Sequence, residues 1–218
     1  MTTRTAVLSL ITTHLHALDG PTPLVGIDGV DGAGKTMFAD ALASELQAEG
    51  RDVVQVSVDG FHRPRDQRYR QGRTSPRGFY EDSYDLEAFR RLVVDPLRPD
   101  GSRTIRTAAF DHRADVAVDG PGVEVPDGTI VLVDGIFLHR PELVGTWDAS
   151  VFLRVPFETT FARMAARDGF PADPDDPANR RYVEGQRLYL ADADPETRAT
   201  FVVDNTDVIR PRMVDRAG

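Results

Sequence analysis

The sequence has no cysteine, one lysine and one tryptophan among its 218 residues. Without cysteine, the chain cannot form a disulfide, a thiolate metal site or a cysteine nucleophile. It also lacks an excess of positive charge, because 35 acidic residues outnumber 26 basic ones and give a formal net charge of −9. Such a surface repels nucleic acid and anionic membranes, so we expect neither as a partner.

Long hydrophobic runs are absent as well. No stretch of 18 consecutive apolar residues occurs, and the apolar run at residues 6–11 is followed by His14 and His16 with no small-residue cleavage site after it. We therefore expect a cytoplasmic protein. The length suits one domain over residues 1–218, and the 40% hydrophobic and 28% charged content is that of an ordinary globular chain.

Apolar periodicity predicts an alternation of helices and strands. We expect an N-terminal helix at about 5–18, strands at 24–28, 53–58, 129–133, 150–155 and 201–203, and helices at 37–46, 86–97, 158–167 and 180–191. A loop is expected at 62–78, and a short strand pair at 104–110 and 115–118. Alternating strands and helices indicate a three-layer α/β/α fold with a parallel sheet, which binds ligands at the carboxyl ends of its strands.

A glycine-rich turn follows the first predicted strand. Residues 29–36, Gly-Val-Asp-Gly-Ala-Gly-Lys-Thr, match the pattern G-x-x-x-x-G-K-[ST] in the strand–loop–helix context that it requires. The backbone N–H groups of such a loop wrap a phosphate, and the helix N-terminus adds a favourable dipole. Lys35 would reach the β- and γ-phosphates, and the Thr36 hydroxyl would bind Mg²⁺. The expected phosphate-binding residues are Gly29, Asp31, Gly32, Ala33, Gly34, Lys35 and Thr36.

Lys35 is the one lysine among 26 basic residues, and the other 25 are arginine. A compact ammonium on a flexible stem fits between phosphate oxygens where a planar guanidinium does not. The presence of lysine at this position therefore supports the phosphate loop. The guanine-reading motif Asn-Lys-x-Asp needs a second lysine, so an ordinary GTPase is excluded.

Three acidic residues, Asp28, Asp59 and Asp134, stand at the ends of predicted strands, and the last two are candidates for chemistry. Asp59 follows the second strand and is the candidate base for an acceptor hydroxyl, while Asp134 follows an apolar strand and is the candidate Mg²⁺ anchor. Each precedes a glycine, and the spacing alone equally allows a turn aspartate in both places.

Arginines occur on the later predicted helices. Arg163 and Arg167 are four residues apart and so share a helix face, and Arg181 lies beyond a Pro- and Asp-rich loop. A mobile lid at about 168–190 that carries such arginines would exclude water and neutralise phosphate charge. For any one of them, a solvated surface helix is the alternative. Six further arginines between residues 63 and 77 would either bind an anionic substrate or balance nearby acids in a solvated insertion.

The series of motifs along the chain resembles the uridine kinase and phosphoribulokinase superfamily of P-loop kinases. The resemblance runs from about residue 22 to 205 and is carried by the phosphate loop, Val-Ser-Val-Asp-Gly-Phe-His-Arg at 56–63, Tyr-Asp at 84–85, Phe-Asp at 110–111, Val-Leu-Val-Asp-Gly-Ile-Phe at 131–137, and Arg-Tyr with Gly-Gln-Arg-x-Tyr at 181–189. The phosphate loop is common to many families, whereas the segment around Asp59 and the order of the later motifs are more specific.

The resemblance implies a P-loop NTPase fold with a five-stranded parallel core sheet and a small helical lid. It also implies ATP and Mg²⁺ as cofactors and phosphorylation of a hydroxyl on a small metabolite. In this family the residue matching Asp59 is the base, that matching Asp134 assists Mg²⁺, and arginines contact the phosphates. We therefore expect Asp59, Lys35 and Arg167 to be catalytic, Thr36 and Asp134 to bind metal, and Arg163 and Arg181 to bind the cofactor with the loop.

The first acceptor implied by the resemblance is the 5′-hydroxyl of uridine or cytidine. The chain has Phe-Tyr-Glu-Asp at 79–82 where uridine kinases typically carry Phe-Asp-His-Pro, and its other motifs also resemble phosphoribulokinase and pantothenate kinase. A sugar, a sugar phosphate or pantothenate is therefore the alternative acceptor. A nucleotide-binding regulatory protein without metabolite turnover is a third hypothesis. The sequence leaves open whether the chain forms a homo-oligomer.

Overall fold

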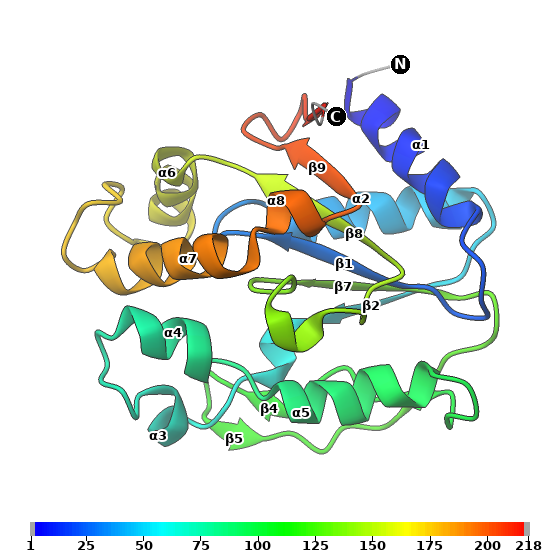
Figure 1. The fold of residues 1–218 in the computed structure, drawn as a ribbon, viewed down its shortest axis with the longest axis horizontal. Coiled ribbons are helices and arrows are strands. Elements are labelled where there is room, and N and C mark those ends of the chain that lie inside the picture. The colour runs from blue at the N-terminus through cyan, green and yellow to red at the C-terminus, as the bar shows by residue number, and fades with distance from the viewer. Residues whose placement is uncertain (1–2, 216–218) are drawn as a thin grey trace.

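The computed structural model describes residues 3–215, which are built around a six-stranded sheet (Figure 1). The order of the strands is β10–β9–β8–β1–β7–β2, and β10 pairs antiparallel with β9 at one edge. The other five strands are parallel, which confirms the expected core. The sheet comprises β1 (Leu24–Gly29), β2 (Val53–Ser57), β7 (Ile130–Gly135), β8 (Ala149–Arg154), β9 (Phe201–Asp204) and β10 (Arg212–Met213).

Helices cover both faces of this sheet, as Figure 1 shows, with α1 and α2 on one side and α5 on the other. The α4 and α7 helices run beside each other at the end of the sheet that carries the site. The helices are α1 (Thr3–His16), α2 (Lys35–Ala48), α3 (Arg65–Arg68), α4 (Pro76–Asp82), α5 (Leu86–Phe89), α6 (Phe157–Asp168), α7 (Arg180–Ala193) and α8 (Pro195–Arg198).

Side chains of the central strands alternate between the two helical layers. Val25 and Ile27 of β1 belong to the apolar cluster formed with α1 and α2, whereas Val131 and Val133 of β7 belong to the cluster formed with α4, α5 and α7. Successive side chains of a strand point to opposite faces, so a strand that is covered on both faces is apolar throughout. The continuous apolar runs in the sequence follow from this three-layer arrangement.

The predicted helix at 86–97 is present but irregular. The α5 helix continues as a π-helical turn, η2 (Arg90–Val94), and then a 3₁₀ turn, η3 (Asp95–Leu97). Pro96 has no N–H, and a proline ring excludes the carbonyl four residues earlier, which is that of Leu92. That carbonyl accepts a hydrogen bond from the Arg106 N–H at 3.0 Å instead. The end of the helix thereby anchors the segment that follows it.

Two other segments differ from the sequence expectation. The expected loop at 62–78 contains α3 and the beginning of α4, whose N-terminus is capped by Ser75 through the Gly78 N–H at 3.0 Å. Serine followed by proline is a helix-start signal, which the arginine-rich composition of this segment obscured. The expected pairing of 104–110 with 115–118 is limited to β4 (Phe110–Asp111) and β5 (Val116–Ala117), because β3 (Thr104–Ile105) pairs with β6 (Val123–Glu124) instead.

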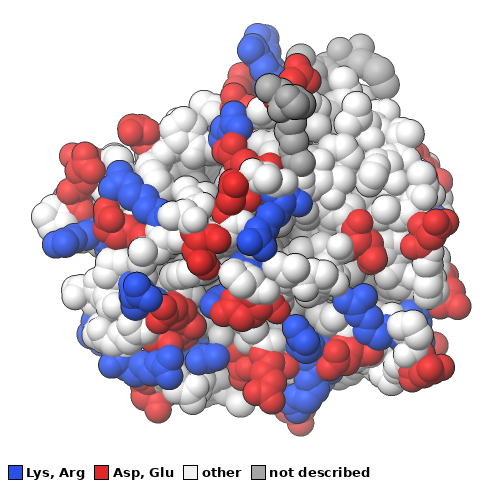
Figure 2. Space-filling model, viewed as in Figure 1, with Lys and Arg blue, Asp and Glu red and all other residues white. Residues whose placement is uncertain are grey.

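Charged side chains of both signs are interspersed over the face shown in Figure 2. They are not gathered by sign on this face, so it presents no extended field of one charge. Among residues 3–215, no helix combines the length and the hydropathy that crossing a bilayer requires.

A glycine sets the distance between α4 and α7. A Cβ atom at Gly185 would lie 2.7 Å from Cδ1 of Phe79 and 2.9 Å from the carbonyl oxygen of Pro76. Both contacts are shorter than real Cβ atoms make, and one of them is to backbone that cannot rotate away. The close approach of the two helices therefore depends on the absence of a side chain at this position.

We predict that Gly185→Ala destabilises the protein. Overpacking at the helix contact should cost about 1–3 kcal/mol, against a gain of about 1 kcal/mol in helix propensity. The free energy of unfolding, measured by urea denaturation, should fall. Gly120→Ala is the matched control, because a Cβ at Gly120 meets nothing within 4 Å. A Gly185→Ala variant as stable as Gly120→Ala would contradict the tight contact.

Candidate active site

The phosphate loop joins β1 to α2, and its carbonyl groups are held from outside. Gly32 has a φ of +75°, and a Cβ there would lie 2.6 Å from the carbonyl oxygen of Thr160, so glycine is required. Arg163 donates to the carbonyl of Gly32 at 3.2 Å, and Asn205 donates to that of Ala33 at 2.8 Å. These contacts hold the loop in place from outside. The N–H groups of Gly29 and Ala33 donate to Asp28 and to the Val30 carbonyl, whereas the first N–H groups of α2 have no partner within the helix and can bind an anion.

Lys35 and Thr36 begin α2 and face the cleft beside the loop. Lys35 is half-buried, and its Nζ donates to the carbonyl of Val30 at 3.0 Å. The Thr36 hydroxyl donates to Oδ2 of Asp134 at 2.9 Å. Asp134 is buried, and burial raises the pKa of its carboxyl against the opposing effects of the Thr36 hydrogen bond and the Lys35 charge. The charged carboxylate is thus under-compensated, and a cation would supply what it lacks.

A magnesium ion fits the Thr36 and Asp134 oxygens by its chemistry. Mg²⁺ prefers oxygen ligands, and it usually combines one or two protein carboxylates with substrate phosphates and water. Such a site needs no cage of protein ligands. Accordingly, residues 3–215 contain no group of three or more His, Asp or Glu side chains placed to hold a metal by themselves.

Asp59 lies in a 3₁₀ turn, η1 (Val58–Phe61), directly after β2. In the parallel pairing of β2 with β7, Ser57 is level with Asp134, so Asp59 and Asp134 lie at the same edge of the sheet. The Asp59 side chain is exposed, and the buried Tyr84 donates its hydroxyl to Oδ1 of Asp59 at 2.9 Å. Burial, followed by the Asp59 charge, raises the pKa of Tyr84 well above its usual value, so the phenol stays protonated.

Asp59 borders two adjoining cavities. The first is the phosphate cleft, whose lining includes Gly32, Gly34, Lys35, Thr36, Asp134 and Arg163. The second extends away from the loop, and its lining includes His62, Arg68, Tyr69, Tyr84, Arg181 and Tyr182. Asp31, Asp59, Ile136, Met164 and Arg167 line both cavities. Groups held in the two cavities would therefore meet beside Asp59.

Asp31 is the loop residue at this junction. Gln186 of α7 donates to its carboxylate at 3.3 Å, so the helix contacts the phosphate loop directly. Burial raises the pKa of the Asp31 carboxyl, the Lys35 charge lowers it, and the Asp59 charge raises it again. A carboxylate in this position responds to charge in either cavity.

The three predicted arginines lie in different surroundings. Arg163 also donates to the carbonyls of Asn205 and Thr206 at 3.0 and 2.9 Å, so it fastens the phosphate loop to the segment after β9. Arg167 borders both cavities, but its side chain is 71% exposed and pairs with Asp168 at 2.7 Å. Arg181 is buried and lines the second cavity rather than the phosphate cleft.

Behind the loop, the fully buried carboxylate of Asp28 accepts several hydrogen bonds. The donors are the Gly29 N–H at 2.7 Å, the His139 N–H at 3.2 Å, His139 Nδ1 at 2.6 Å and the Tyr189 hydroxyl. His139 Nε2 lies 2.8 Å from the Ser150 hydroxyl on β8. These residues are all buried, so the arrangement of Ser150, His139 and Asp28 is structural rather than a nucleophilic triad open to substrate.

Sequence reasoning missed Asn205, Gln186 and His139. Asn205 directly follows β9, so the strand-end rule that selected Asp59 and Asp134 would have found it. Gln186 stands in the Gly-Gln-Arg-x-Tyr motif quoted above, but that motif does not reveal its contact with Asp31, and His139 carries no local signal. Both roles depend on partners more than 100 residues away in sequence.

We predict that Asp134→Asn raises the thermal stability of the ligand-free protein and weakens its Mg²⁺-dependent nucleotide binding. Asparagine keeps an oxygen for the Thr36 hydrogen bond but removes a buried, under-compensated charge. The melting temperature should rise by about 2–4 °C for each kcal/mol gained. Calorimetry with and without ATP and Mg²⁺ measures both effects, with the exposed Asp52→Asn as control. A lower melting temperature in the ligand-free variant would show that the charge stabilises the fold.

No family model matches the chain. Its sequence is 28% identical over 166 residues to nicotinamide riboside kinase from Eremothecium gossypii, a match that covers 68% of this chain and 65% of the relative. It is 20% identical over 146 residues to uridine kinase from Ureaplasma parvum, covering 66% of this chain and 68% of that protein. The chain thus spans about two thirds of the length of these relatives.

Solved structures share the fold over most of the chain. A possible uridine kinase from Bacillus stearothermophilus has a TM-score of 0.70 at 22% identity and covers 89% of this chain and 96% of its own. A protein provisionally named fructose transport system kinase, from Silicibacter sp. TM1040, has a TM-score of 0.69 at 26% identity, with 88% and 96% covered. Phosphoribulokinase from Rhodobacter spheroides has a TM-score of 0.59 at 16% identity, with 84% and 70% covered. The chain is thus similar in sequence to small-molecule kinases, and its fold resembles that of the P-loop kinases of the uridine kinase and phosphoribulokinase superfamily.

Proposed function

We propose that the chain is a cytoplasmic ATP-dependent kinase that phosphorylates a hydroxyl of a small metabolite. One observation carries this proposal: Asp59 lines both the phosphate cleft and the second cavity, where the two adjoin. A kinase needs such a meeting point, because a phosphoryl donor and a hydroxyl acceptor have to approach each other with a base beside them. The relatives named above are kinases of small molecules, which agrees with this arrangement.

The residues of the phosphate cleft would bind the donor. The N–H groups of loop residues 30–32 and 34 and the Lys35 ammonium would hold the phosphates, with Lys35 exchanging its Val30 carbonyl for phosphate oxygen. Thr36 and Asp134 would hold Mg²⁺, which supplies charge neutralisation at the phosphates when it is bound. Arg163 keeps the loop in place from behind.

Asp59 would orient the acceptor hydroxyl and accept its proton. Its carboxylate is exposed to the cavities, and the Tyr84 hydroxyl fixes one of its oxygens. The other oxygen is then available to the substrate. Arg167, at the end of α6 on the wall shared by the two cavities, would stabilise the phosphoryl group in transfer. A lid at about 168–190, which follows it, would help exclude water.

The acceptor has two candidate classes. A pyrimidine nucleoside, phosphorylated at the 5′-hydroxyl of uridine or cytidine, follows from the resemblance and from the relatives named uridine kinase. A sugar, a sugar phosphate or pantothenate is favoured by the sequence at 79–82, which differs from the uridine kinase motif. The structural likeness to a protein named as a fructose transport system kinase also favours it. A regulatory protein that binds nucleotide without turnover is the remaining alternative.

We predict that Asp59→Asn lowers kcat by about 10²-fold or more, which is the contribution typical of a general base. The dissociation constant of ATP should stay within about twofold of the wild-type value. Asparagine can still accept the Tyr84 hydrogen bond, so the fold should be retained. Coupled measurement of ADP release gives kcat, and calorimetry gives ATP binding. Asp52→Asn, exposed at the other end of β2, serves as the control and should match the wild type. Near-normal turnover of Asp59→Asn would remove this residue from the mechanism.

A panel assay separates the acceptor classes. ADP release should be stimulated by at least one compound among uridine, cytidine, fructose, fructose 6-phosphate and pantothenate. A kinase shows acceptor-dependent ADP release that Asp59→Asn abolishes. ATP binding without stimulation by any acceptor would favour the regulatory alternative.

A further inference from the structure

The cavity beyond Asp59 is rich in arginine, although the chain as a whole is acidic. Its lining contains five arginines and three aspartates. Of these aspartates, Asp31 and Asp59 lie at the boundary with the phosphate cleft, and Asp168 is paired with Arg167. The deeper part of the cavity, around Arg68 and Arg181, therefore carries the excess positive charge. The five arginines are Arg65, Arg68, Arg113, Arg167 and Arg181.

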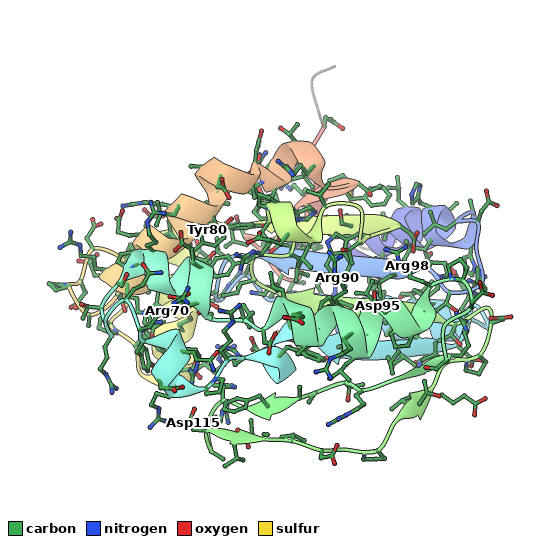
Figure 3. All side chains as sticks on the ribbon, turned by 60° about the horizontal axis from the view of Figure 1, so that its bottom comes forward. Arg70, Tyr80, Arg90, Asp95, Arg98 and Asp115 are labelled. Atoms are coloured by element: carbon green, nitrogen blue, oxygen red, sulfur yellow. The ribbon has the colours of Figure 1, made fainter. Side chains whose placement is uncertain are left out.

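Arg68 and Arg181 differ from the other three because they are buried, at 8% and 9% relative exposure. Arg68 has one acidic partner, Asp115, at 3.3 Å, and also donates to the His112 carbonyl at 3.3 Å. Asp115 lies at the outer edge of the molecule beside α3 (Figure 3) and is partly exposed. It is also shared with the Arg65 N–H at 2.9 Å. The charge of Arg68 is thus balanced by a single, partly exposed carboxylate that also binds the Arg65 backbone.

Arg181 has no carboxylate within ion-pair distance among residues 3–215. Its Nη1 donates a hydrogen bond to the carbonyl of Arg73 at 2.7 Å. The Nε atoms of Arg181 and Arg68 are both buried without a hydrogen-bond partner. Since a guanidinium has five N–H donors, one carbonyl leaves most of the hydrogen-bonding capacity of Arg181 unused.

Aromatic rings account for part of the stabilisation of Arg181. Its guanidinium lies 4.6 Å from the ring centroid of Tyr69 and 5.5 Å from that of Phe79. These contacts offset some of the cost of burying the charge. They supply no oxygen acceptor for its N–H groups, however. A buried cation with unpaired donors and no acidic partner can bind an anion that the protein itself does not provide.

We propose that the acceptor is an anionic hydroxyl compound, a carboxylate or a phosphate monoester, whose charged group binds Arg68 and Arg181 while its hydroxyl faces Asp59. A guanidinium presents paired N–H donors that match the oxygens of both groups. This inference rests on the kinase activity proposed above and chooses among its acceptors. A neutral nucleoside would leave the two buried guanidinium groups without a counter-charge.

The reaction balances with these groups alone. The acceptor hydroxyl oxygen forms a bond to the γ-phosphorus of ATP, and the bond from that phosphorus to the β,γ-bridging oxygen breaks. The hydroxyl proton passes to Asp59, and ADP leaves with the electron pair. The anionic group of the acceptor takes no part in bond making and serves only to position the hydroxyl.

Matched pairs of acceptors test the charge requirement. The pairs are glycerate and glycerol, pantothenate and pantothenyl alcohol, and fructose 6-phosphate and fructose, with uridine as the neutral nucleoside. Binding is measured by calorimetry with a non-hydrolysable ATP analogue and Mg²⁺, and turnover by ADP release. We expect at least one anionic member to bind and react at least about tenfold better than its neutral partner, and the pairs tell carboxylate from phosphate. Equal or better use of the neutral members, or binding of none of the anionic ones, overturns the proposal.

Variants of Arg181 test the assignment to this residue. Arg181→Met should raise the KM of the anionic acceptor by about tenfold or more, with a smaller change in kcat and an unchanged KM for ATP. Arg181→Lys should recover part of the affinity for the anionic acceptor, because lysine keeps the positive charge but lacks the paired N–H donors of the guanidinium. Arg180→Met is the matched control, since Arg180 is the exposed neighbour on the same helix. It should leave all three constants unchanged.

Stability distinguishes binding from a structural role. If Arg181 serves the acceptor, Arg181→Met should retain the melting temperature of the ligand-free protein and lose only the stabilisation that the anionic acceptor confers. A large fall in melting temperature together with an unchanged KM would assign Arg181 to the fold and overturn the proposal. If a neutral acceptor is phosphorylated and Asp59→Asn abolishes this turnover, the kinase function stands and the anionic acceptor alone fails.

Discussion

The buried carboxylate of Asp28 is the constraint on which the geometry of the site depends. Asp28 is the penultimate residue of β1, and its carboxylate accepts a hydrogen bond from the N–H of Gly29, the first residue of the phosphate loop, and binds His139 after β7 and Tyr189 on α7. Through His139 it also reaches Ser150 on β8. A buried charge is tolerated only when hydrogen bonds surround it. If one of these elements moved away, the carboxylate would lose a hydrogen bond and the folded state would be destabilised. Burial, followed by the Asp28 charge, raises the pKa of Tyr189 well above its usual value, so that phenol remains a donor.

Because these elements share contacts with Asp28, site residues that are distant in sequence are held in fixed relative positions. The phosphate loop follows Asp28 directly, Asp134 lies five residues before His139, and Arg181 lies in the first turn of the helix that carries Tyr189. The phosphate cleft and the arginine-rich cavity are therefore both positioned by elements that contact Asp28 in the core. On the outside of the loop, Arg163 and Asn205 complete the frame by holding the carbonyls of Gly32 and Ala33.

Much of the donor side could be predicted from the sequence, because its signals are local. The phosphate loop occupies consecutive residues, and Asp59 and Asp134 stand at strand ends, which parallel pairing brings to one edge. The acceptor side could not be predicted in the same way. Arg181 was expected beside the cofactor because it follows a loop typical of lids, but its surroundings are set by the close contact of α4 with α7, which Gly185 permits. No local pattern reveals that a surface-type residue becomes buried between two helices.

The contact of Lys35 with the Val30 carbonyl has a consequence for the covalent chemistry of the protein. Because Lys35 is the one lysine of the chain, its ε-amine is the one side-chain amine that acylating reagents or lysine-modifying enzymes can find. Acetylation there would remove a positive charge from the phosphate cleft itself. Amine modification of this protein is therefore confined, among its side chains, to the nucleotide site, and a bound nucleotide would shield it. In most proteins such reagents modify many surface lysines. In this protein, the extent of side-chain labelling reports whether the phosphate loop is occupied.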